Sequence, residues 1–190
     1  METTPEFEAL LNYLKRDRGC DLTGYKRSSL MRRVQHRMQS IKIQSYGVYL
    51  QHLQTHAEEY QSLLDDVLIN VTSFFRDRDT WDYLATHVIP KIITSKQPDE
   101  PIRVWSAGCA SGQEIYSILI LFAEALGIDA CLDRVQGYAT DVDEAVIQQA
   151  RFGTYTTHEV RGVPSDLLEK YFESTNRGYV FHAALRRRVI

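Results

Sequence analysis

The segment Arg103-Val104-Trp105-Ser106-Ala107-Gly108-Cys109-Ala110-Ser111-Gly112-Gln113-Glu114 decides the fold class of this chain. A short apolar run leads into a loop of small residues, and apolar residues at helical spacing follow as far as Leu126. A strand, a glycine loop and a helix in this order bring the backbone close to a nucleotide-like ligand in α/β proteins. The segment therefore predicts a strand over 102–107 and a helix over 113–126, joined by a ligand-binding loop that contains Gly108.

The acidic residue Glu114 narrows the class of ligand. A helix N-terminus often binds a phosphate group. A carboxylate at this position repels a phosphate and therefore disfavours a phosphate-bearing ligand. A ligand without phosphate and with positive charge, such as S-adenosylmethionine, fits better. The dinucleotide fingerprint that ends at Gly112 would need glycine where Ala107 and Cys109 stand, so an NAD site is disfavoured. A tight turn without any ligand stays open as an alternative.

A second strand is predicted over 135–140, and a helix that begins near Asp143 follows it. Strand, helix, strand and helix in this order predict a parallel sheet. Asp141 directly follows the second strand, where a carboxylate can accept hydrogen bonds from both hydroxyls of a ribose. We read Asp143 as the N-cap of the next helix.

The first half of the chain shows helical patterns and no strand pattern. Apolar residues repeat at helical spacing in five segments, which are 6–18, 26–40, 45–55, 57–69 and 77–89. The segment 94–101 holds two prolines among polar residues and is interpreted as a linker. The sequence thus predicts a helical subdomain over 1–93 and an α/β domain over 102–190.

The α/β part is short for its class. A helix is predicted over 164–173 and a strand or half a hairpin over 179–183, so three strands can be counted. A doubly wound sheet of this type has roughly five to seven strands. We therefore expect an incomplete Rossmann-like sheet, from a fragment or from half of a swapped dimer. Its open edge along 102–107 is expected to favour self-association.

The basic charge is concentrated near the N-terminus. Residues 1–42 hold nine Lys or Arg against five Asp or Glu, although the whole chain has a net charge of −3. The segment 26–42 has six basic residues and no acidic one. A solvated helix face is the simplest reading, and an acidic docking partner is the functional one. Nucleic acid is disfavoured, because no aromatic interleaving or base-reading motif accompanies the charge.

The remaining composition favours a cytoplasmic protein. The three cysteines lack metal spacing, and we expect reduced thiols and no metal site. No apolar run approaches the roughly 18 residues of a membrane span, and charges occur throughout the first twenty residues. Neither a signal peptide nor membrane insertion is expected.

The segment Asn70-Val71-Thr72-Ser73-Phe74-Phe75-Arg76 allows two readings. Its hydroxyls can cap the fifth helix, and its guanidinium can bind a ligand carboxylate through two hydrogen bonds. The residues alone leave both readings open.

Five segments in order resemble the chemotaxis receptor methyltransferase (CheR) family, from about residue 6 to the end of the chain. They are 32–38 (RRVQHRM), 70–76 (NVTSFFR), 104–117 (VWSAGCASGQEIYS), 139–143 (ATDVD) and 150–155 (ARFGTY). This family transfers a methyl group from S-adenosylmethionine to glutamate side chains of receptors and leaves S-adenosylhomocysteine. The resemblance thus implies an S-adenosylmethionine-dependent protein-glutamate O-methyltransferase.

The resemblance also implies residue roles. Asn70, Thr72 and Arg76 would hold the methionine end of the cofactor. Glu114 would be a further cofactor contact and Asp141 the ribose-binding acid, beside the glycine loop. Where the family more often has Glu-Glu-Pro, this chain has Gln113-Glu114-Ile115, so the second acid is retained. The docking surface for the acidic receptor helices would comprise Lys26, Arg32, Arg33 and Arg37.

No catalytic residue is predicted, because an acceptor glutamate is already ionised at neutral pH. Two other functions remain open. The chain could be a non-catalytic module that binds S-adenosylmethionine or a receptor, or a different nucleotide-binding enzyme such as an oxidoreductase.

Overall fold

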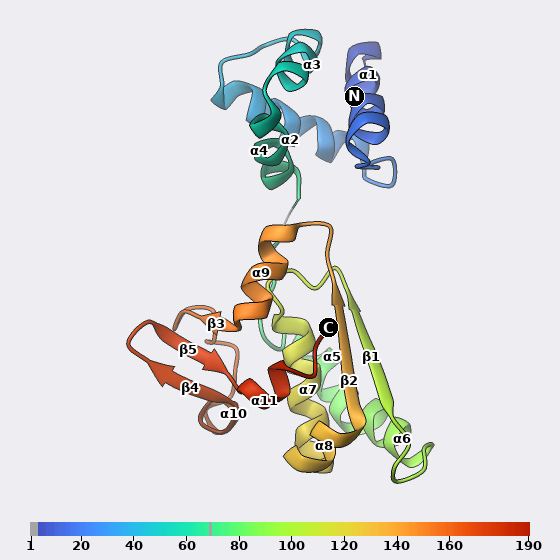
Figure 1. Cartoon of the computed structure of the whole chain (residues 1–190), viewed down its shortest axis with the longest axis vertical. Helices are drawn as coiled ribbons and strands as arrows, with labels where there is room; N and C mark the ends of the chain where they lie inside the picture. Colours follow the sequence, from blue (N-terminus) through green and yellow to red (C-terminus); the bar gives the residue numbers. More distant parts are fainter. Residues whose placement is uncertain (1–3, 69) are drawn as a thin grey trace. The chain divides into compact units, whose positions relative to one another are not determined.

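A computed structural model describes residues 4–68 and 70–190. The chain divides into two compact units, Met1–Ile69 and Asn70–Ile190 (Figure 1). Each unit has its own hydrophobic core. The units are therefore described separately.

Four helices form the first unit: α1 (Pro5–Arg18), α2 (Arg27–Ser40), α3 (Tyr46–Thr55) and α4 (Ala57–Val67). Thr4 caps α1 by accepting a hydrogen bond from the amide of Phe7, and Gly19 ends this helix in the left-handed conformation. The apolar faces meet in a core whose fully buried members include Phe7, Leu14, Leu30, Val34 and Leu53. The four helices agree with the sequence patterns to within two residues at each end, and residue 69, where the fourth predicted helix ends, lies outside the described residues.

The second unit begins with α5 (Arg78–Tyr83), η1 (Leu84–Val88) and α6 (Ile89–Thr94), which follow each other without a break. The sequence predicted one helix that ends at Ile89. The π-helical segment η1 lies just before Pro90, which has no amide hydrogen and crowds the preceding turn. The wider π turn accommodates this proline, and the helix continues to Thr94.

The predicted domain boundary at 94–101 is wrong. The division lies between residues 69 and 70, so α5, η1 and α6 belong to the second unit. This part of the chain contributes four buried residues to the core of the second unit: Phe74, Phe75, Trp81 and Ile89. The two prolines mark only the loop that leads into the first strand.

A parallel pair of strands forms the centre of the second unit. β1 (Ile102–Ala107) pairs with β2 (Val135–Thr140), with Ile102 opposite Val135 and Ala107 opposite Thr140. The connection consists of α7 (Gln113–Leu126) and α8 (Ile128–Arg134), and α9 (Glu144–Phe152) follows β2 (Figure 1). The sequence predicted β1, α7, β2 and α9, but it did not predict the short α8 after Gly127.

The two edges of this pair differ. The amides of Gly137 and Ala139 donate to the carbonyls of Arg188 and Ile190, both at 2.8 Å, so residues 188–190 add to β2 in parallel. No strand in the described part of the chain pairs with the opposite edge of β1. The structure thus contains the incomplete parallel sheet that the sequence predicts.

A small antiparallel sheet follows α9. Its strands β3 (Thr154–Tyr155), β4 (Phe172–Thr175) and β5 (Gly178–Phe181) have the order β3–β5–β4. α10 (Ser165–Tyr171) precedes β4, and α11 (Ala183–Arg186) follows β5. The helix predicted to reach residue 173 ends at Tyr171, because Phe172 begins β4 opposite Phe181. The sequence predicted one strand of this sheet and missed the other two.

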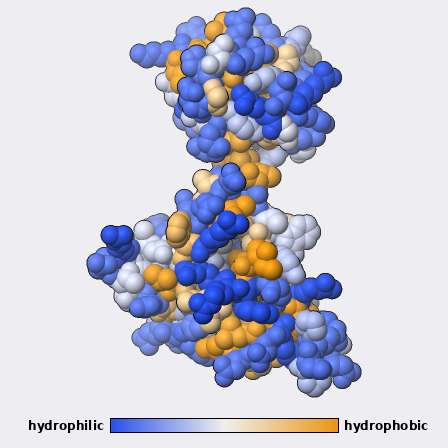
Figure 2. Space-filling model, viewed as in Figure 1, coloured by the Kyte–Doolittle hydropathy of each residue, from blue (hydrophilic) through white to orange (hydrophobic). Residues whose placement is uncertain are grey.

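Hydrophilic residues cover most of the surface seen in Figure 2, and hydrophobic ones gather in a few places on the second unit. Within residues 4–68 and 70–190, no single helix is long and apolar enough to cross a membrane. α7 and α8 together meet the criteria of length and composition, but they are bent by 118° at their junction.

Candidate functional site

The glycine loop between β1 and α7 is fixed to the end of β2. The amides of Gly108 and Cys109 donate to the carbonyl oxygen of Thr140 at 2.8 and 3.0 Å. Gly112, with a φ of 92°, lies so close to its neighbours that a Cβ would be 3.0 Å from both Ala150 and Tyr116. A side chain at Gly112 would be strained by the positive φ and crowded by these neighbours, and the loop is held close to the carboxyl ends of both strands.

Asp141 lies against this loop. Its Oδ2 accepts a hydrogen bond from the amide of Ala110 at 2.8 Å, and its Oδ1 accepts one from the amide of Asp143 at 3.0 Å. An ionised carboxylate has about four acceptor positions, so two remain for a ligand. Asp141 thus keeps acceptor positions beyond the two hydrogen bonds that it accepts from the backbone.

Glu114 lies in the first turn of α7 with its side chain exposed. Its Oε1 accepts a hydrogen bond at 2.7 Å from the hydroxyl of Ser106, a residue of β1 that is only 1% exposed. The N-terminus of a helix stabilises a carboxylate. Glu114 and Asp141 give this end of the sheet two carboxylates, which suit a cationic ligand and repel a phosphate.

The segment 70–76 contacts both elements that follow the strands. The Asn70 amide Nδ2 donates to Asp143 Oδ2 at 2.6 Å. The amide of the buried Phe75 donates to the hydroxyl of Ser117 on α7 at 3.1 Å. The exposed Arg76 donates to the carbonyl of Val71 at 3.2 Å. The segment is thus docked on α7 and on the turn into α9.

Thr72 and Arg76 keep polar groups for a ligand. Thr72 is half-buried, and no hydrogen bond of its hydroxyl is found within the described residues. Arg76 uses one guanidinium nitrogen for Val71. The structure therefore brings Asn70 to the turn that carries Asp141, and it leaves the donors of Thr72 and Arg76 available.

Asp143 is the N-cap of α9, as the sequence predicted. Its Oδ1 accepts hydrogen bonds from the amides of Ala145 and Val146 at 2.9 and 3.4 Å. Its contact with Asn70 was not predicted, nor was the support of Glu114 by Ser106. Both contacts join residues of different elements, and no local pattern reveals such a contact.

Comparison with protein families assigns both units. Residues 70–190 match the domain described as CheR methyltransferase, SAM binding domain. Residues 5–68 match the CheR methyltransferase all-alpha domain. The chain belongs to the CheR methyltransferase family. S-adenosylmethionine is the cofactor of the matched domain, and the carboxylate-rich site fits a sulfonium nucleoside.

Curated relatives of this CheR chain include chemotaxis protein methyltransferases. The one of Listeria innocua is 33% identical over 147 residues, which are 77% of this chain and 54% of the relative. The one of Escherichia coli is 31% identical over 156 residues, which are 81% of this chain and 51% of the relative. An uncharacterized 104.1 kDa protein of Rhodobacter capsulatus is 31% identical over 166 residues, 17% of its length. The chain spans about half the length of the two methyltransferases.

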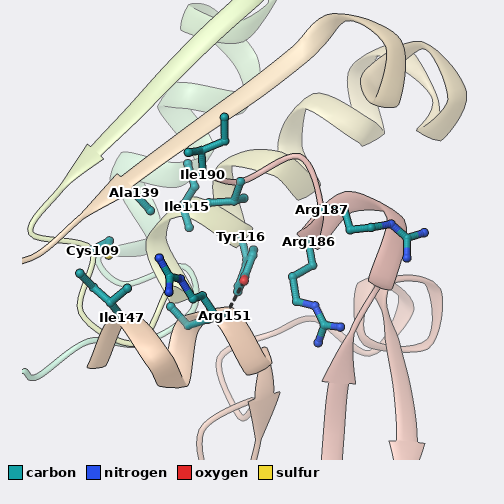
Figure 3. Close-up of a pocket in the computed structure, with 11 residues that line it drawn as sticks. Cys109, Ile115, Tyr116, Ala139, Ile147, Arg151, Arg186, Arg187 and Ile190 are labelled. Atoms are coloured by element: carbon teal, nitrogen blue, oxygen red, sulfur yellow. Dashed lines mark hydrogen bonds between the residues drawn. The ribbon is translucent and has the colours of Figure 1, made fainter. Parts of the chain in front are cut away.

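A cavity of about 400 Å³ lies behind the glycine loop of the CheR chain (Figure 3). Ile115, Ile147 and Ile190 contribute apolar walls, and arginines from α9 and α11 also line it. Cys109 is the loop residue that lines it, whereas Glu114 and Asp141 do not. Burial raises the pKa of the Cys109 thiol to about 11, and the Asp141 charge adds to this rise. The two site carboxylates therefore lie outside the wall of this cavity, and the wall contains a neutral thiol.

The basic helix α2 uses two of its arginines inside the first unit. Arg37 forms a pair of hydrogen bonds with Glu59 at 2.8 and 2.6 Å, and the hydroxyl of Tyr49 adds a third to the same carboxylate. Arg37 holds the pKa of this buried carboxyl below its ordinary value, although burial opposes the shift. Arg33 donates to the carbonyls of Asp66 and Val67 at the end of α4. Both arginines therefore fasten α2 to α4.

Lys26 and Arg32 remain exposed. Within the described residues, neither side chain forms a hydrogen bond or an ion pair. Of the four basic residues predicted to dock a partner, these two present their charge most freely to solvent. Also within the described residues, no three His, Cys, Asp or Glu side chains are grouped as metal ligands.

Proposed function

We propose that this CheR chain carries the cofactor site of a protein-glutamate O-methyltransferase that acts on chemoreceptor-type proteins. The observation that supports this most strongly is the Asp141 carboxylate held against the glycine loop, with Glu114 at the start of α7. This arrangement lies inside the domain that matches the S-adenosylmethionine-binding domain of the family.

Each wall of the proposed site has a role. Asp141 accepts hydrogen bonds from the ribose hydroxyls, and Gly108 lets the loop backbone approach the nucleoside. Glu114 contributes negative charge and accepts a hydrogen bond. Arg76 pairs with the ligand carboxylate, and Asn70 and Thr72 contribute polar contacts to the same amino-acid end.

The transfer needs no general base. The ligand supplies a methyl group activated by its sulfonium sulfur. An acceptor glutamate with an ordinary pKa of about 4.3 is ionised at neutral pH. Its oxygen lone pair forms the bond to the methyl carbon while the carbon–sulfur bond breaks, and that electron pair stays on sulfur. A glutamyl methyl ester and S-adenosylhomocysteine result, and the opposite charges of the two reactants are both lost.

The chain's own residues then align the reacting atoms and exclude water. A methyl transfer between a carboxylate and a sulfonium gains most from such positioning, because no proton has to move. The rigid attachment of the loop to Thr140 and Asp141 serves this purpose.

Receptor docking is assigned to the basic helix α2. Lys26 and Arg32 face solvent and supply the charge that steers an acidic receptor helix. Arg33 and Arg37 hold α2 in place, and their remaining donors contribute at the rim of this surface. The partner is an acidic, glutamate-bearing receptor or signalling protein.

The test is methyl transfer by the protein in its full natural reading frame. Labelled S-adenosylmethionine is supplied with a receptor peptide that bears glutamate, and a matched peptide has glutamine at the same positions. We expect a base-labile methyl ester on the glutamate peptide alone. Binding of the cofactor without any transfer would contradict the transferase function and favour a non-catalytic module.

We also propose that the 190-residue chain self-associates through β1. Its outer edge has no partner strand in the described part, and Trp105 is 68% exposed opposite Tyr138, which is 37% exposed. Trp105→Lys should weaken association, whereas Tyr25→Lys, in the first unit, should not. Sedimentation velocity measures this, and a monomer at all concentrations would contradict the proposal.

A further inference from the structure

Asp143 uses its two carboxylate oxygens for different purposes. The residue is only 4% exposed. Oδ1 caps α9 by accepting from the amides of Ala145 and Val146. Oδ2 accepts from the side-chain amide of Asn70, which lies 73 residues earlier in the chain, at 2.6 Å.

Helix capping explains only the first oxygen. Serine and asparagine cap helices about as well as aspartate does, and neither has a second carboxylate oxygen. A buried carboxylate oxygen without a donor is costly, and Asn70 supplies the donor. The aspartate at this position is therefore explained by the contact with Asn70 in addition to the cap.

The contact also fixes the orientation of the Asn70 amide. An ionised carboxylate only accepts hydrogen bonds, so Asn70 must present its Nδ2 to Asp143. Its Oδ1 then points elsewhere and is available as an acceptor. An acceptor at this place suits the ammonium group of an amino acid.

Two further hydrogen bonds extend the connection to the glycine loop. The backbone amide of Asp143 donates to Asp141 Oδ1 at 3.0 Å. The amide of Ala110 donates to Asp141 Oδ2 at 2.8 Å. Asn70, Asp143, Asp141 and Ala110 thus form one chain of hydrogen bonds that joins three segments.

We propose that Asp143 is a positioning residue of the cofactor site. Its carboxylate orients the Asn70 amide toward the amino-acid end of the ligand, while its backbone amide supports Asp141 at the ribose end. This inference rests on the proposed function, because the two ends are those of S-adenosylmethionine.

The experiment compares S-adenosylhomocysteine affinity in the full protein and in three variants, Asn70→Ala, Asp143→Ser and the double variant. Serine can still cap α9 through its hydroxyl, but it has no second oxygen to accept a hydrogen bond from Asn70. We expect Asp143→Ser to weaken binding roughly fivefold or more, the scale of a hydrogen bond to a charged group. The double variant should bind with the affinity of whichever single variant binds more weakly, because both substitutions break the same hydrogen bond between Asn70 and Asp143.

Asp166→Ser is the matched control, because this exposed aspartate lies in α10 outside the site. It should bind as the wild type does. Thermal unfolding of Asp143→Ser shows whether the α9 cap is retained. Unchanged affinity in Asp143→Ser would overturn the proposal, and so would losses that add in the double variant.

A second readout needs no ligand. Exchange of the Asn70 side-chain amide protons should accelerate in Asp143→Ser, which removes their acceptor, but not in Asp166→Ser. Failure of the wild type to bind S-adenosylhomocysteine would contradict the proposed function, and exchange of the Asn70 side-chain amide would still test positioning. Equal exchange of the Asn70 side-chain amide in Asp143→Ser and wild type would overturn the positioning role.

Discussion

Asp141 accepts two backbone hydrogen bonds and keeps acceptor positions for a ligand. We predict that Asp141→Ala weakens S-adenosylhomocysteine binding at least about tenfold, which corresponds to about 1.4 kcal/mol. Asp133→Ala is the control, because Asp133 is exposed in α8, just before the opposite end of β2. Isothermal titration calorimetry gives both affinities. Equal affinity of Asp141→Ala and wild type would remove Asp141 from the site.

Glu59 is a buried carboxylate that pairs with the guanidinium of Arg37 and accepts a hydrogen bond from the hydroxyl of Tyr49. Its pKa is lowered in the folded chain, so its stabilising contribution is present above the unfolded value of about 4.3. The contribution is lost as the pH falls through the lower, folded value. Acid should therefore destabilise the first unit through this residue.

Glu59→Gln should remove that acid sensitivity and lower stability at neutral pH by about 2 kcal/mol or more, because Arg37 loses its counter-charge. Glu58→Gln changes an exposed neighbour and should do neither. Urea unfolding between about pH 3 and pH 7 measures both effects. The same pH dependence in Glu59→Gln and wild type would show that this pair does not control acid stability.

The turn from β1 into α7 depends on two glycines with different surroundings. Both have positive φ, but a Cβ at Gly108 would meet nothing within 4 Å, whereas one at Gly112 would meet two side chains at 3.0 Å. Gly112→Ala should therefore cost about 1–3 kcal/mol more than Gly108→Ala, through steric overlap in addition to backbone strain. Denaturant midpoints of the two variants test this. Equal losses would mean that the neighbours of Gly112 move aside freely.

The regular elements could be predicted where the pattern is local and long. β1, β2 and α7 have the residues that hydrophobic spacing predicts, 102–107, 135–140 and 113–126. α8 has seven residues and directly follows Gly127, so its pattern is too short to be distinctive. β3 has two residues, and β4 has one buried residue of four. Their pairing with β5 supplies the structure that their own sequence does not indicate.

The candidate site could be predicted in its parts but not in its connections. Asp141 and Glu114 follow from their places after a strand and at the start of a helix. The hydrogen bond between Asn70 and Asp143 joins residues 73 positions apart. Such a contact depends on how the elements pack, which one sequence does not specify. The same holds for Arg33 and Arg37, whose pattern suggests a free basic face although both bind α4.

The two units have separate cores, and this has a consequence for unfolding. Leu53→Ala, at a fully buried position of the first core, should destabilise that unit by about 2–5 kcal/mol. The thermal transition of the second unit should not move. Leu119→Ala, at a fully buried position of the second core, should have the opposite pattern. Differential scanning calorimetry distinguishes the transitions, and a joint shift would show that the units unfold together.

Whether the CheR chain binds a sulfonium nucleoside is tested most directly by calorimetry with S-adenosylhomocysteine and with NAD. The carboxylates of Glu114 and Asp141 and the broken dinucleotide spacing at Ala107 and Cys109 favour the first ligand and disfavour the second. We predict saturable binding of S-adenosylhomocysteine at one site and no heat of binding with NAD. Binding of NAD, or no binding of S-adenosylhomocysteine, would contradict the assignment of this site.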